Sequence, residues 1–263
     1  MRRTFAIITA LFALGSNLWS QTRAEELRAQ LLDASDGSVF VAAHRGAWRE
    51  APENSLQAIE KAIEMGVEIV EIDVRRTVGG RLILSHDPVI FRPSGAPTLE
   101  EALLAARGRV LLNLDKAFRH FDDVVAVAEG TGTLEQIIMK SSRNPRQVMS
   151  VLGQYRDKVL FMPIVNLDSA GAMARIEEYM RTLDPPMYEL TFSREDNPVL
   201  PLALALLKGR SRLWYTALWP SLCGGHDDSR PMPDGIGWLI DKAGAGAVQT
   251  DIPAQLIDYL KHR

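Results

Sequence analysis

The sequence predicts a (β/α)8 barrel, an α/β fold in which eight parallel strands alternate with helices. Eight apolar runs of strand length recur along the chain, each is followed by a segment with helical periodicity, and the turns between them are mostly short. Eight such units in about 225 residues match the usual size of this barrel. The predicted core strands begin near residues 39, 68, 110, 136, 159, 188, 212 and 247.

The first strand and helix have clear boundaries. Residues 39–43 form an apolar run of strand length. A helix over residues 56–65 is predicted next, because Asn54 or Ser55 is a suitable cap, the apolar residues share one face, and the run stops at Gly66.

The second predicted strand continues into a hairpin. Its apolar residues alternate with Glu71 and Asp73, which is the period of a strand. Gly79 and Gly80 supply a tight turn, and residues 81–84 form the returning strand. The barrel should therefore carry a short hairpin after its second strand.

The later elements alternate in the same order. Thr98 caps a helix over residues 98–106 and is followed by two glutamates in the first turn, where the helix dipole favours them. Pro201 should break the helix expected over residues 197–207. The other elements are predicted as strands at 110–114, 136–140, 159–164, 188–192, 212–217 and 247–250, and helices at 24–32, 121–129, 145–155, 170–183, 235–242 and 253–262.

A doubly wound open sheet is the alternative arrangement of alternating strands and helices. It would need a glycine-rich phosphate-binding turn after the first strand, and the stretch from His44 to Ala47 is not one. The glycines Gly244 and Gly246 precede a strand rather than follow one, so they indicate a turn.

The composition indicates a globular protein with ample core. The 263 residues are 46% hydrophobic and 24% charged, and the net charge of −3 gives no basic surface for nucleic acid. The single cysteine, Cys223, excludes an internal disulfide, and nothing around it supports a nucleophilic role. The oligomeric state is not predicted.

The N-terminus has the form of a secretory signal peptide. Residues 1–3 are basic, residues 5–14 are almost entirely apolar, and small residues then allow cleavage after Ser20 or after Ala24. We take residues 1–24 as the leader and residues 25–263 as one mature domain. An uncleaved N-terminal anchor is the alternative. Removing residues 1–24 takes away three arginines and no acid, so the net charge becomes −6. The mature protein is expected to be periplasmic or secreted, without stable membrane insertion.

Polar residues gather where the predicted strands end. In a barrel, functional side chains come from the C-terminal ends of the strands, so these residues should share one rim. Glu71 and Asp73 lie two apart on one strand and project from the same face, which is costly unless a cation joins them or one takes a proton. The other strand-end candidates are His44, Arg45, His86, Asp115 and Lys140.

The same residues resemble a known family. Their order and spacing are similar to the signature of glycerophosphodiester phosphodiesterases, most specifically in residues 44–87 and more loosely to the end of the chain. The matching motifs are His44-Arg45-Gly46, Pro52-Glu53-Asn54-Ser55, Glu71-Ile72-Asp73-Val74, Gly79-Gly80, His86-Asp87, Pro97 to Leu103, and Gln249-Thr250-Asp251-Ile252-Pro253.

The resemblance implies a role for each matching residue. His44 and His86 correspond to the general acid and base, in an order that the sequence does not assign. Arg45 corresponds to the arginine that contacts the phosphate. Glu71 and Asp73 correspond to two ligands of one divalent cation, Ca²⁺ or Mg²⁺.

The third metal ligand departs from the family pattern. The family has a Glu-x-Lys sequence on the third barrel strand, whereas this chain has Asp115 followed directly by Lys116. Asp115 takes the position of the third ligand, and the family lysine would fall on Ala117. Lys140 could then supply the missing positive charge beside the phosphate. The segment from Pro88 to Pro97 is also short, which implies a much reduced insertion and a more open mouth.

These residues suit the hydrolysis of a small-molecule phosphodiester. Carboxylate oxygens select a hard cation, the cation and an arginine offset the charge of the phosphate, and two histidines transfer protons near neutral pH. The expected reaction releases an alcohol and a phosphomonoester from a glycerophosphodiester or a related compound. Two alternatives are a phospholipase-D-like hydrolase of lysolipids and a catalytically inactive barrel that binds ligands.

Three further features are left open by the sequence. The loop from Cys223 to Asp228 ends in His226-Asp227-Asp228, which could bind a metal but more often forms a solvated loop. Trp214 and Trp219 flank a strand end and could line a pocket or pack in the core. Glu189 could point into the barrel mouth or toward a helix.

Overall fold

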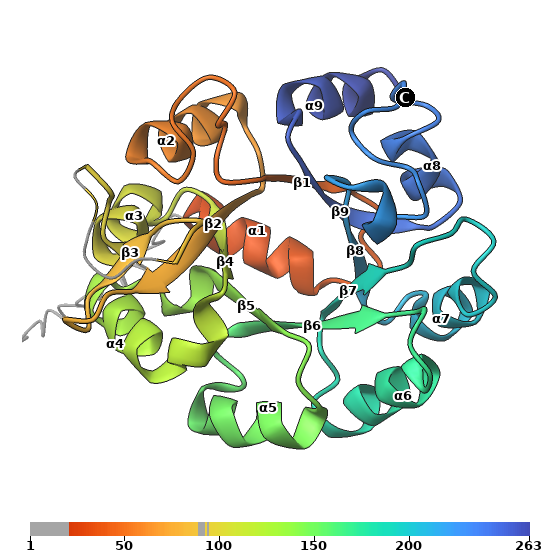
Figure 1. The fold of residues 1–263 in the computed structure, drawn as a ribbon, viewed down its shortest axis with the longest axis horizontal. Coiled ribbons are helices and arrows are strands. Elements are labelled where there is room, and N and C mark those ends of the chain that lie inside the picture. Colours follow the sequence, from red (N-terminus) through yellow and green to blue (C-terminus); the bar gives the residue numbers. More distant parts are fainter. Residues whose placement is uncertain (1–20, 89–92, 94) are drawn as a thin grey trace, which may run out of the picture.

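The chain folds into a closed barrel of eight parallel strands surrounded by helices (Figure 1). The structure is a computed structural model that describes residues 21–88, 93 and 95–263. β1 pairs with β2 on one side and with β9 on the other, which closes the sheet. The predicted barrel is confirmed. Its strands are β1 (Phe40–Ala43), β2 (Ile69–Arg76), β4 (Leu111–Asp115), β5 (Ile137–Ser141), β6 (Leu160–Asn166), β7 (Met187–Thr191), β8 (Arg212–Thr216) and β9 (Ala245–Thr250).

Nine α-helices lie in the described residues, and all but the first lie outside the barrel wall. They are α1 (Arg23–Leu32), α2 (Leu56–Met65), α3 (Leu99–Ala106), α4 (Phe121–Thr131), α5 (Pro145–Leu152), α6 (Ala172–Thr182), α7 (Leu200–Leu207), α8 (Ile236–Asp241) and α9 (Pro253–Lys261). Short 3₁₀ helices occupy Ala117–His120, Leu134–Gln136, Gly153–Tyr155 and Pro220–Leu222. No helix of the described residues is long and apolar enough to cross a membrane.

One predicted helix begins later than expected. The helix expected over residues 197–207 starts at Leu200, and Pro201 lies in its first turn instead of breaking it. The Asn197 side chain accepts hydrogen bonds from the backbone N–H groups of Val199 and Leu200, at 2.8 and 3.2 Å, and so forms a turn before the helix. Proline is tolerated in a first turn because its missing N–H would have no helical partner there.

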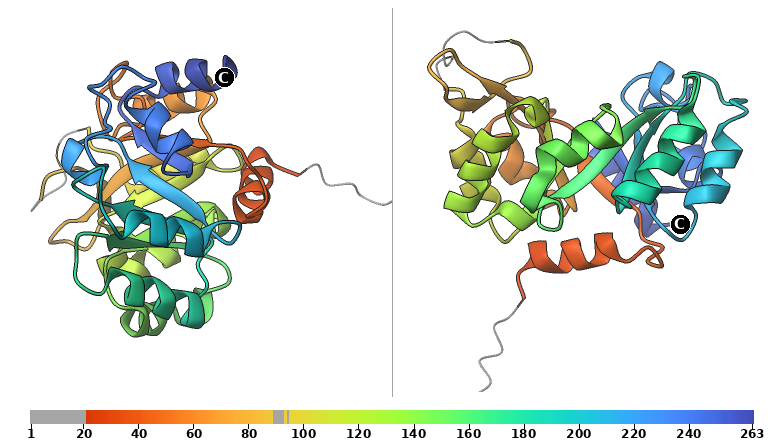
Figure 2. Two further views of the ribbon diagram at one scale, coloured as in Figure 1. Left: turned by 90° about the vertical axis from the view of Figure 1, so that its right-hand side faces the viewer. Right: turned by 90° about the horizontal axis from the view of Figure 1, so that it is seen from below.

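The predicted hairpin is present and projects from the barrel. β3 (Leu82–Leu84) pairs antiparallel with the end of β2, and Gly80 has the positive φ of 85° that such a turn requires. Figure 2 shows this hairpin at the end of the barrel opposite to α1. The predicted short insertion from Pro88 to Pro97 lies partly outside the described residues, which omit 89–92 and 94.

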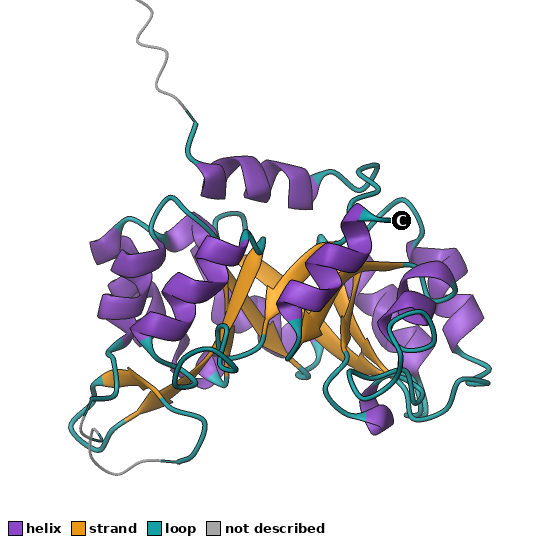
Figure 3. Ribbon diagram, turned by 90° about the horizontal axis from the view of Figure 1, so that it is seen from above, coloured by secondary structure: helices purple, strands orange, loops and turns teal. Residues whose placement is uncertain are grey.

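Helix α1 lies across one end of the barrel (Figure 3), and apolar side chains fill the barrel at that end. Leu27 and Leu31 of α1 join a buried cluster with inward-facing residues of the strands, which separates the barrel interior from solvent at this end. Trp214 belongs to the same cluster and is fully buried, so it packs in the core rather than lining a substrate pocket. The other members are Phe40, Ala42, Ile69, Leu111, Ile138, Leu160, Met162, Met187 and Ala247.

The start of α1 is part of the folded domain. Thr22 caps this helix in a reciprocal pair with Glu25, and Arg23 donates hydrogen bonds to the carbonyls of Gly66, Val67 and Arg109. The buried Ala24 donates its N–H to the carbonyl of Gly108 at 3.2 Å. These contacts place residues 22–24, which the predicted leader included, within the barrel domain.

Arg212 connects α1 and the loop after it to the barrel through hydrogen bonds. Its buried guanidinium donates to the carbonyls of Leu31, Ser38 and Gln30 at 3.2, 2.8 and 2.7 Å, and to Asp36 at 2.8 Å. Three of these hydrogen bonds satisfy backbone carbonyls that are wholly or partly buried, and the fourth pairs the cation with a carboxylate.

Replacing Arg212 with alanine is expected to lower the free energy of unfolding by about 2–4 kcal/mol, because the four acceptors lose their donor. Chemical denaturation of the mature chain measures this. Arg210→Ala, which removes an exposed arginine two residues away, is the matched control and should change stability by less than about 0.5 kcal/mol. Equal losses in the two variants would contradict the role of Arg212.

Candidate active site

The turn after β1 presents His44 and Arg45 at the barrel rim. Arg45 and Gly46 both have positive φ, at 53° and 77°. A Cβ at position 46 would lie 2.6 Å from the carbonyl carbon of Ala58 in α2, so only glycine allows this close approach. The chain therefore reverses tightly against α2 and leaves the two preceding side chains over the strand ends.

Three carboxylates meet at the same rim. Glu71 and Asp73 leave β2 toward the interior and are buried, and Asp115 leaves β4 at the position paired with Asp73. One oxygen from each lies within 4.8 Å of the others. The predicted ligand set is therefore brought together.

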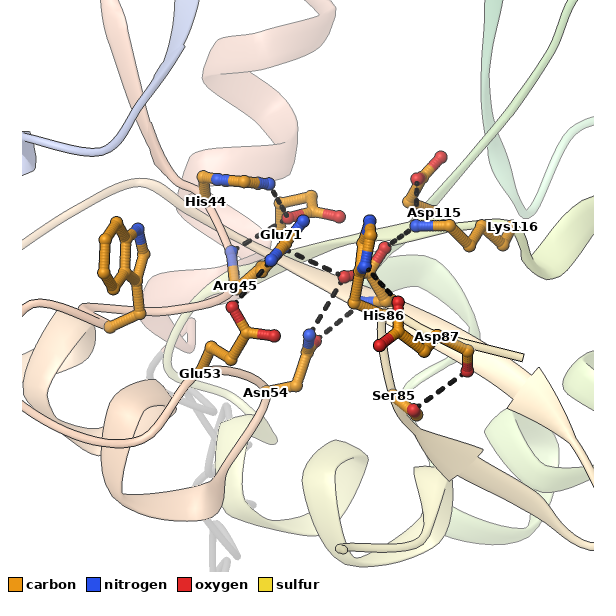
Figure 4. A network of polar contacts seen from close by, with 12 residues as sticks. His44, Arg45, Glu53, Asn54, Glu71, Ser85, His86, Asp87, Asp115 and Lys116 are labelled. Atoms are coloured by element: carbon orange, nitrogen blue, oxygen red, sulfur yellow. Dashed lines mark hydrogen bonds and ion pairs between the residues drawn. The ribbon is translucent and has the colours of Figure 1, made fainter. Parts of the chain in front are cut away.

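Arg45 and Asn54 hold two of these carboxylates in place (Figure 4). The backbone N–H of Arg45 donates to Glu71 at 2.9 Å, and its guanidinium Nε lies 3.3 Å from Asp73 and its Nη1 2.6 Å from Glu53. The Asn54 side chain donates to the Asp73 carboxylate at 2.9 Å and accepts the Asp73 backbone N–H at 2.8 Å.

Two lysines bring positive charge to the carboxylates. Lys116, which is in the left-handed region with a φ of 61°, contacts Asp73 and lies 3.2 Å from Asp115. Lys140 is buried and lies 3.5 Å from Asp115 and 3.2 Å from Glu189. Lys140 is thus engaged by carboxylates, and a contact with phosphate stays a prediction.

The pKa values of Glu71 and Asp115 are shifted in opposite directions. Burial, together with the charges of Asp73 and Asp115, raises the pKa of Glu71 to about 8. Burial alone would raise the pKa of Asp115, but Lys140 and Lys116 outweigh it and lower that pKa to about 2. Without a bound cation, Glu71 is therefore the carboxyl that takes a proton at neutral pH.

The residues present fit a hard divalent cation. All three candidate ligands offer carboxylate oxygens, which Ca²⁺ and Mg²⁺ prefer. Burial, and then the charges of Asp73 and Asp115, raise the pKa of Glu71, and a divalent ion bound beside it would favour its ionised form.

His44 is buried, and its two ring nitrogens face different carboxylates. Its Nδ1 lies 2.7 Å from Asp251, and its Nε2 lies 3.9 Å from Glu71 and so faces the carboxylates. Trp219, which is 50% exposed, lies edge-on to the imidazole with the ring centres 6.3 Å apart. Trp219 therefore borders the site, unlike Trp214.

His86 is more accessible than His44. Its side chain is 43% exposed, its Nδ1 lies 2.9 Å from Asp87, and its backbone carbonyl accepts hydrogen bonds from Arg75 at 2.7 and 3.2 Å. In the view of Figure 4, Arg45 and Glu71 lie between the two histidine rings.

The loop after β8 has a structural explanation. His226 stacks on Trp238 with the ring centres 3.9 Å apart, and Asp227 accepts hydrogen bonds from the backbone and side chain of Ser229. Asp228 accepts hydrogen bonds from Thr250 and Asp251. The three side chains have separate partners, so they do not form one metal site.

The sequence did not predict three contacts of the site. Lys116 and Asn54 both contact Asp73, and Asp251 contacts His44. Glu189, whose direction the sequence left open, lies 3.2 Å from Lys140. A carboxylate after the last strand, opposite a histidine after the first, is the signal that could have indicated Asp251, because these strands are neighbours in a closed barrel.

The sequence is similar to known phosphodiesterases. Residues 44–144 match the model of the "Glycerophosphoryl diester phosphodiesterase family", and residues 161–260 match a model described as a domain of unknown function. A glycerophosphodiester phosphodiesterase of Caldanaerobacter subterraneus subsp. tengcongensis is 37% identical over 68 residues, which cover 24% of this chain and 28% of that protein. Lysophospholipase D GDPD3 of Mus musculus is 35% identical over 204 residues, which cover 73% of this chain and 58% of that protein. The chain thus spans less than two thirds of either relative.

Solved structures share the barrel. A phosphodiesterase of Oleispira antarctica, solved in complex with the product sn-glycerol-3-phosphate, matches with a TM-score of 0.64 and 16% identity, over 88% of this chain and 99% of that one. At this identity the likeness concerns the fold. The family match over residues 44–144, the identity with named phosphodiesterases and the shared barrel together support a place for this chain in the glycerophosphodiester phosphodiesterase family.

Proposed function

We propose that this protein is a metal-dependent phosphodiesterase that hydrolyses glycerophosphodiesters, or closely related phosphodiesters, to an alcohol and a phosphomonoester. The observation that carries the proposal is the convergence of Glu71, Asp73 and Asp115 within 4.8 Å at one barrel rim. His44 and Arg45 contact this cluster from the adjoining strand end.

Each residue has a role that its surroundings support. Glu71, Asp73 and Asp115 would hold one divalent cation, Ca²⁺ or Mg²⁺, which supplies positive charge for a phosphate oxygen. The Arg45 guanidinium reaches the same place and would bind a second phosphate oxygen. His44 and His86 would transfer the protons, one from the attacking hydroxyl or water and one to the leaving alkoxide.

The substrate class is tested by product analysis. Glycerophosphocholine, an aryl phosphodiester and detergent-solubilised lysophosphatidylcholine are incubated with the mature chain, and phosphomonoester and alcohol are quantified. Release from glycerophosphocholine at a rate above that from the lysolipid supports the proposal. The lysolipid reaction is the second candidate, because a match over 204 residues is to a lysophospholipase D. Binding without turnover of any compound would indicate an inactive barrel.

We also propose that the protein is exported and that its leader is removed after Ser20. Cleavage after Ala24 would remove the Thr22 cap, the three hydrogen bonds of Arg23 and the buried Ala24, whereas cleavage after Ser20 keeps them all. N-terminal sequencing of the protein from a periplasmic or culture fraction should therefore begin at Gln21. A sequence beginning at Glu25, or full-length protein held in the membrane fraction, would contradict this.

A further inference from the structure

We infer that Asp251 and Asp228 are positioning residues for His44: Asp251 sets the ring's tautomer and orientation, and Asp228 fixes Asp251. The inference rests on the proposed function, since it assigns His44 a proton-transfer role. It concerns two carboxylates, Asp228 in the loop after β8 and Asp251 directly after β9, that lie outside the proposed ligand set.

The hydrogen bonds at Asp251 determine which nitrogen of His44 carries the proton. One oxygen, Oδ1, lies 2.7 Å from His44 Nδ1 and 2.6 Å from Trp48 Nε1. An indole N–H only donates, and an ionised carboxylate only accepts, so Nδ1 must also donate to this oxygen. Hydrogen bonding lowers the pKa of Asp251 despite its burial, which keeps it an acceptor.

The proton on Nδ1 leaves Nε2 as the reactive nitrogen. In the neutral ring, Nε2 then has the free lone pair, and it is the nitrogen that faces Glu71 at 3.9 Å. Asp251 therefore aims a proton acceptor at the place where the proposed substrate would bind. Without Asp251, the ring could rotate or adopt the other tautomer.

Asp228 holds the backbone of Asp251. Its Oδ2 accepts the N–H of Asp251 at 2.6 Å, and its Oδ1 accepts the hydroxyl of Thr250 at 2.7 Å. Its own N–H donates to the carbonyl of Ala217 at 2.8 Å, at the end of β8. On the other side, Arg49 Nε donates to the carbonyl of Asp251 at 2.8 Å. Asp251 is thus fixed through its side chain, its N–H and its carbonyl.

Asp228 is a carboxylate in a partly buried position. Burial, and to a smaller extent the charge of Asp251, raises the pKa of Asp228 to about 6. Its two carboxylate oxygens are both occupied by donors from the end of β9, so its side chain serves as the acceptor that orients Asp251.

The test combines kinetics with the tautomer of His44. The variants are Asp251→Ala, Asp251→Asn and Asp228→Asn. The control is Asp258→Asn, which removes an exposed carboxylate beside His262 on α9, away from the barrel rim. For each, kcat and KM are measured with glycerophosphocholine, the melting temperature is recorded, and ¹⁵N NMR with Mg²⁺ at a pH where the ring is neutral reports which nitrogen of His44 is protonated.

We expect Asp251→Ala to lower kcat about 10–100-fold with KM changed less than about 3-fold, as for other groups that orient a reacting histidine. The His44 signal should move from the Nδ1–H form toward the Nε2–H form. Asp251→Asn keeps an acceptor, so it should retain the Nδ1–H form and recover part of kcat. Asp228→Asn should lower kcat less than Asp251→Ala, and the control should change neither readout.

Unchanged kcat in Asp251→Ala, or a loss of kcat with the tautomer unchanged, would overturn the inference. The tautomer also separates this inference from the proposed function. If the wild-type chain hydrolyses no phosphodiester, the proposed function fails, whereas the positioning of His44 still stands or falls on the Nδ1–H signal and its loss in Asp251→Ala. The nearly isosteric Asp251→Asn keeps the test valid if the alanine variant does not fold.

Discussion

Replacing Glu71 with glutamine is expected to abolish divalent-cation binding and to lower kcat by at least about 100-fold. Glutamine keeps the shape of the side chain and the acceptor for the N–H of Arg45, but it removes a buried carboxylate of the cluster. Loss of an outer partner of a metal ligand already costs about 10–100-fold, so loss of a ligand charge should cost at least as much. Calorimetric titration with Ca²⁺ and Mg²⁺, followed by kinetics, measures both effects.

When the cation is removed, the stability of the wild type and that of Glu71→Gln should depend differently on pH. The pKa of Glu71 is raised to about 8 in the folded protein, so this group favours folding most below its ordinary pKa near 4.5 and loses that contribution as the pH rises toward 8. In EDTA, wild-type stability should therefore fall relative to Glu71→Gln between these values. Added cation should raise the melting temperature of the wild type alone. Parallel pH profiles, or equal stabilisation of both proteins by cation, would contradict the metal site.

His44→Ala and His86→Ala are each expected to lower kcat by about 10²–10⁴-fold while the fold is kept. A positioned proton donor or acceptor contributes this much, and a phosphodiester reaction needs both. Both side chains leave loops at the rim rather than the apolar core, so circular dichroism and cooperative melting should be preserved. His262→Ala, at the exposed end of α9, is the control and should keep full activity. Near-full activity in either site variant would refute the two-histidine mechanism.

Most of the fold could be predicted because its signals are local. Each strand is an apolar run bounded by polar turns. Thr98 caps its helix as predicted from residue type, and Ser55, one of two predicted candidates, caps α2. The alternation in β2 also predicted that Glu71 and Asp73 lie on one face. Because functional side chains of a barrel come from the C-terminal ends of its strands, Asp115 was expected to lie beside them. The predicted start of α7 was wrong because the Asn197 side chain forms a turn where periodicity alone predicts a helix.

The remaining contacts of the site depend on backbone conformation and on closure of the barrel, which the spacing of residues along the sequence does not predict. Lys116 reaches Asp73 because its backbone is left-handed, an uncommon conformation for lysine that residue type does not predict. Asp251 reaches His44 across 207 positions of the chain because the barrel closes between β1 and β9. The role of Asp228 was not predicted because its side chain accepts hydrogen bonds from the end of β9 rather than from its own loop.

Metal-dependent hydrolysis by the mature chain is the most direct test of the proposed function. Glycerophosphocholine and an aryl phosphodiester are incubated with the protein, first untreated, then in excess EDTA, and then after removal of EDTA and addition of Ca²⁺, Mg²⁺ or Mn²⁺ separately. We expect phosphomonoester release that EDTA abolishes and that Ca²⁺ or Mg²⁺ restores, because Glu71, Asp73 and Asp115 offer only carboxylate oxygens. Turnover that is indifferent to EDTA would show that these carboxylates do not form a catalytic metal site.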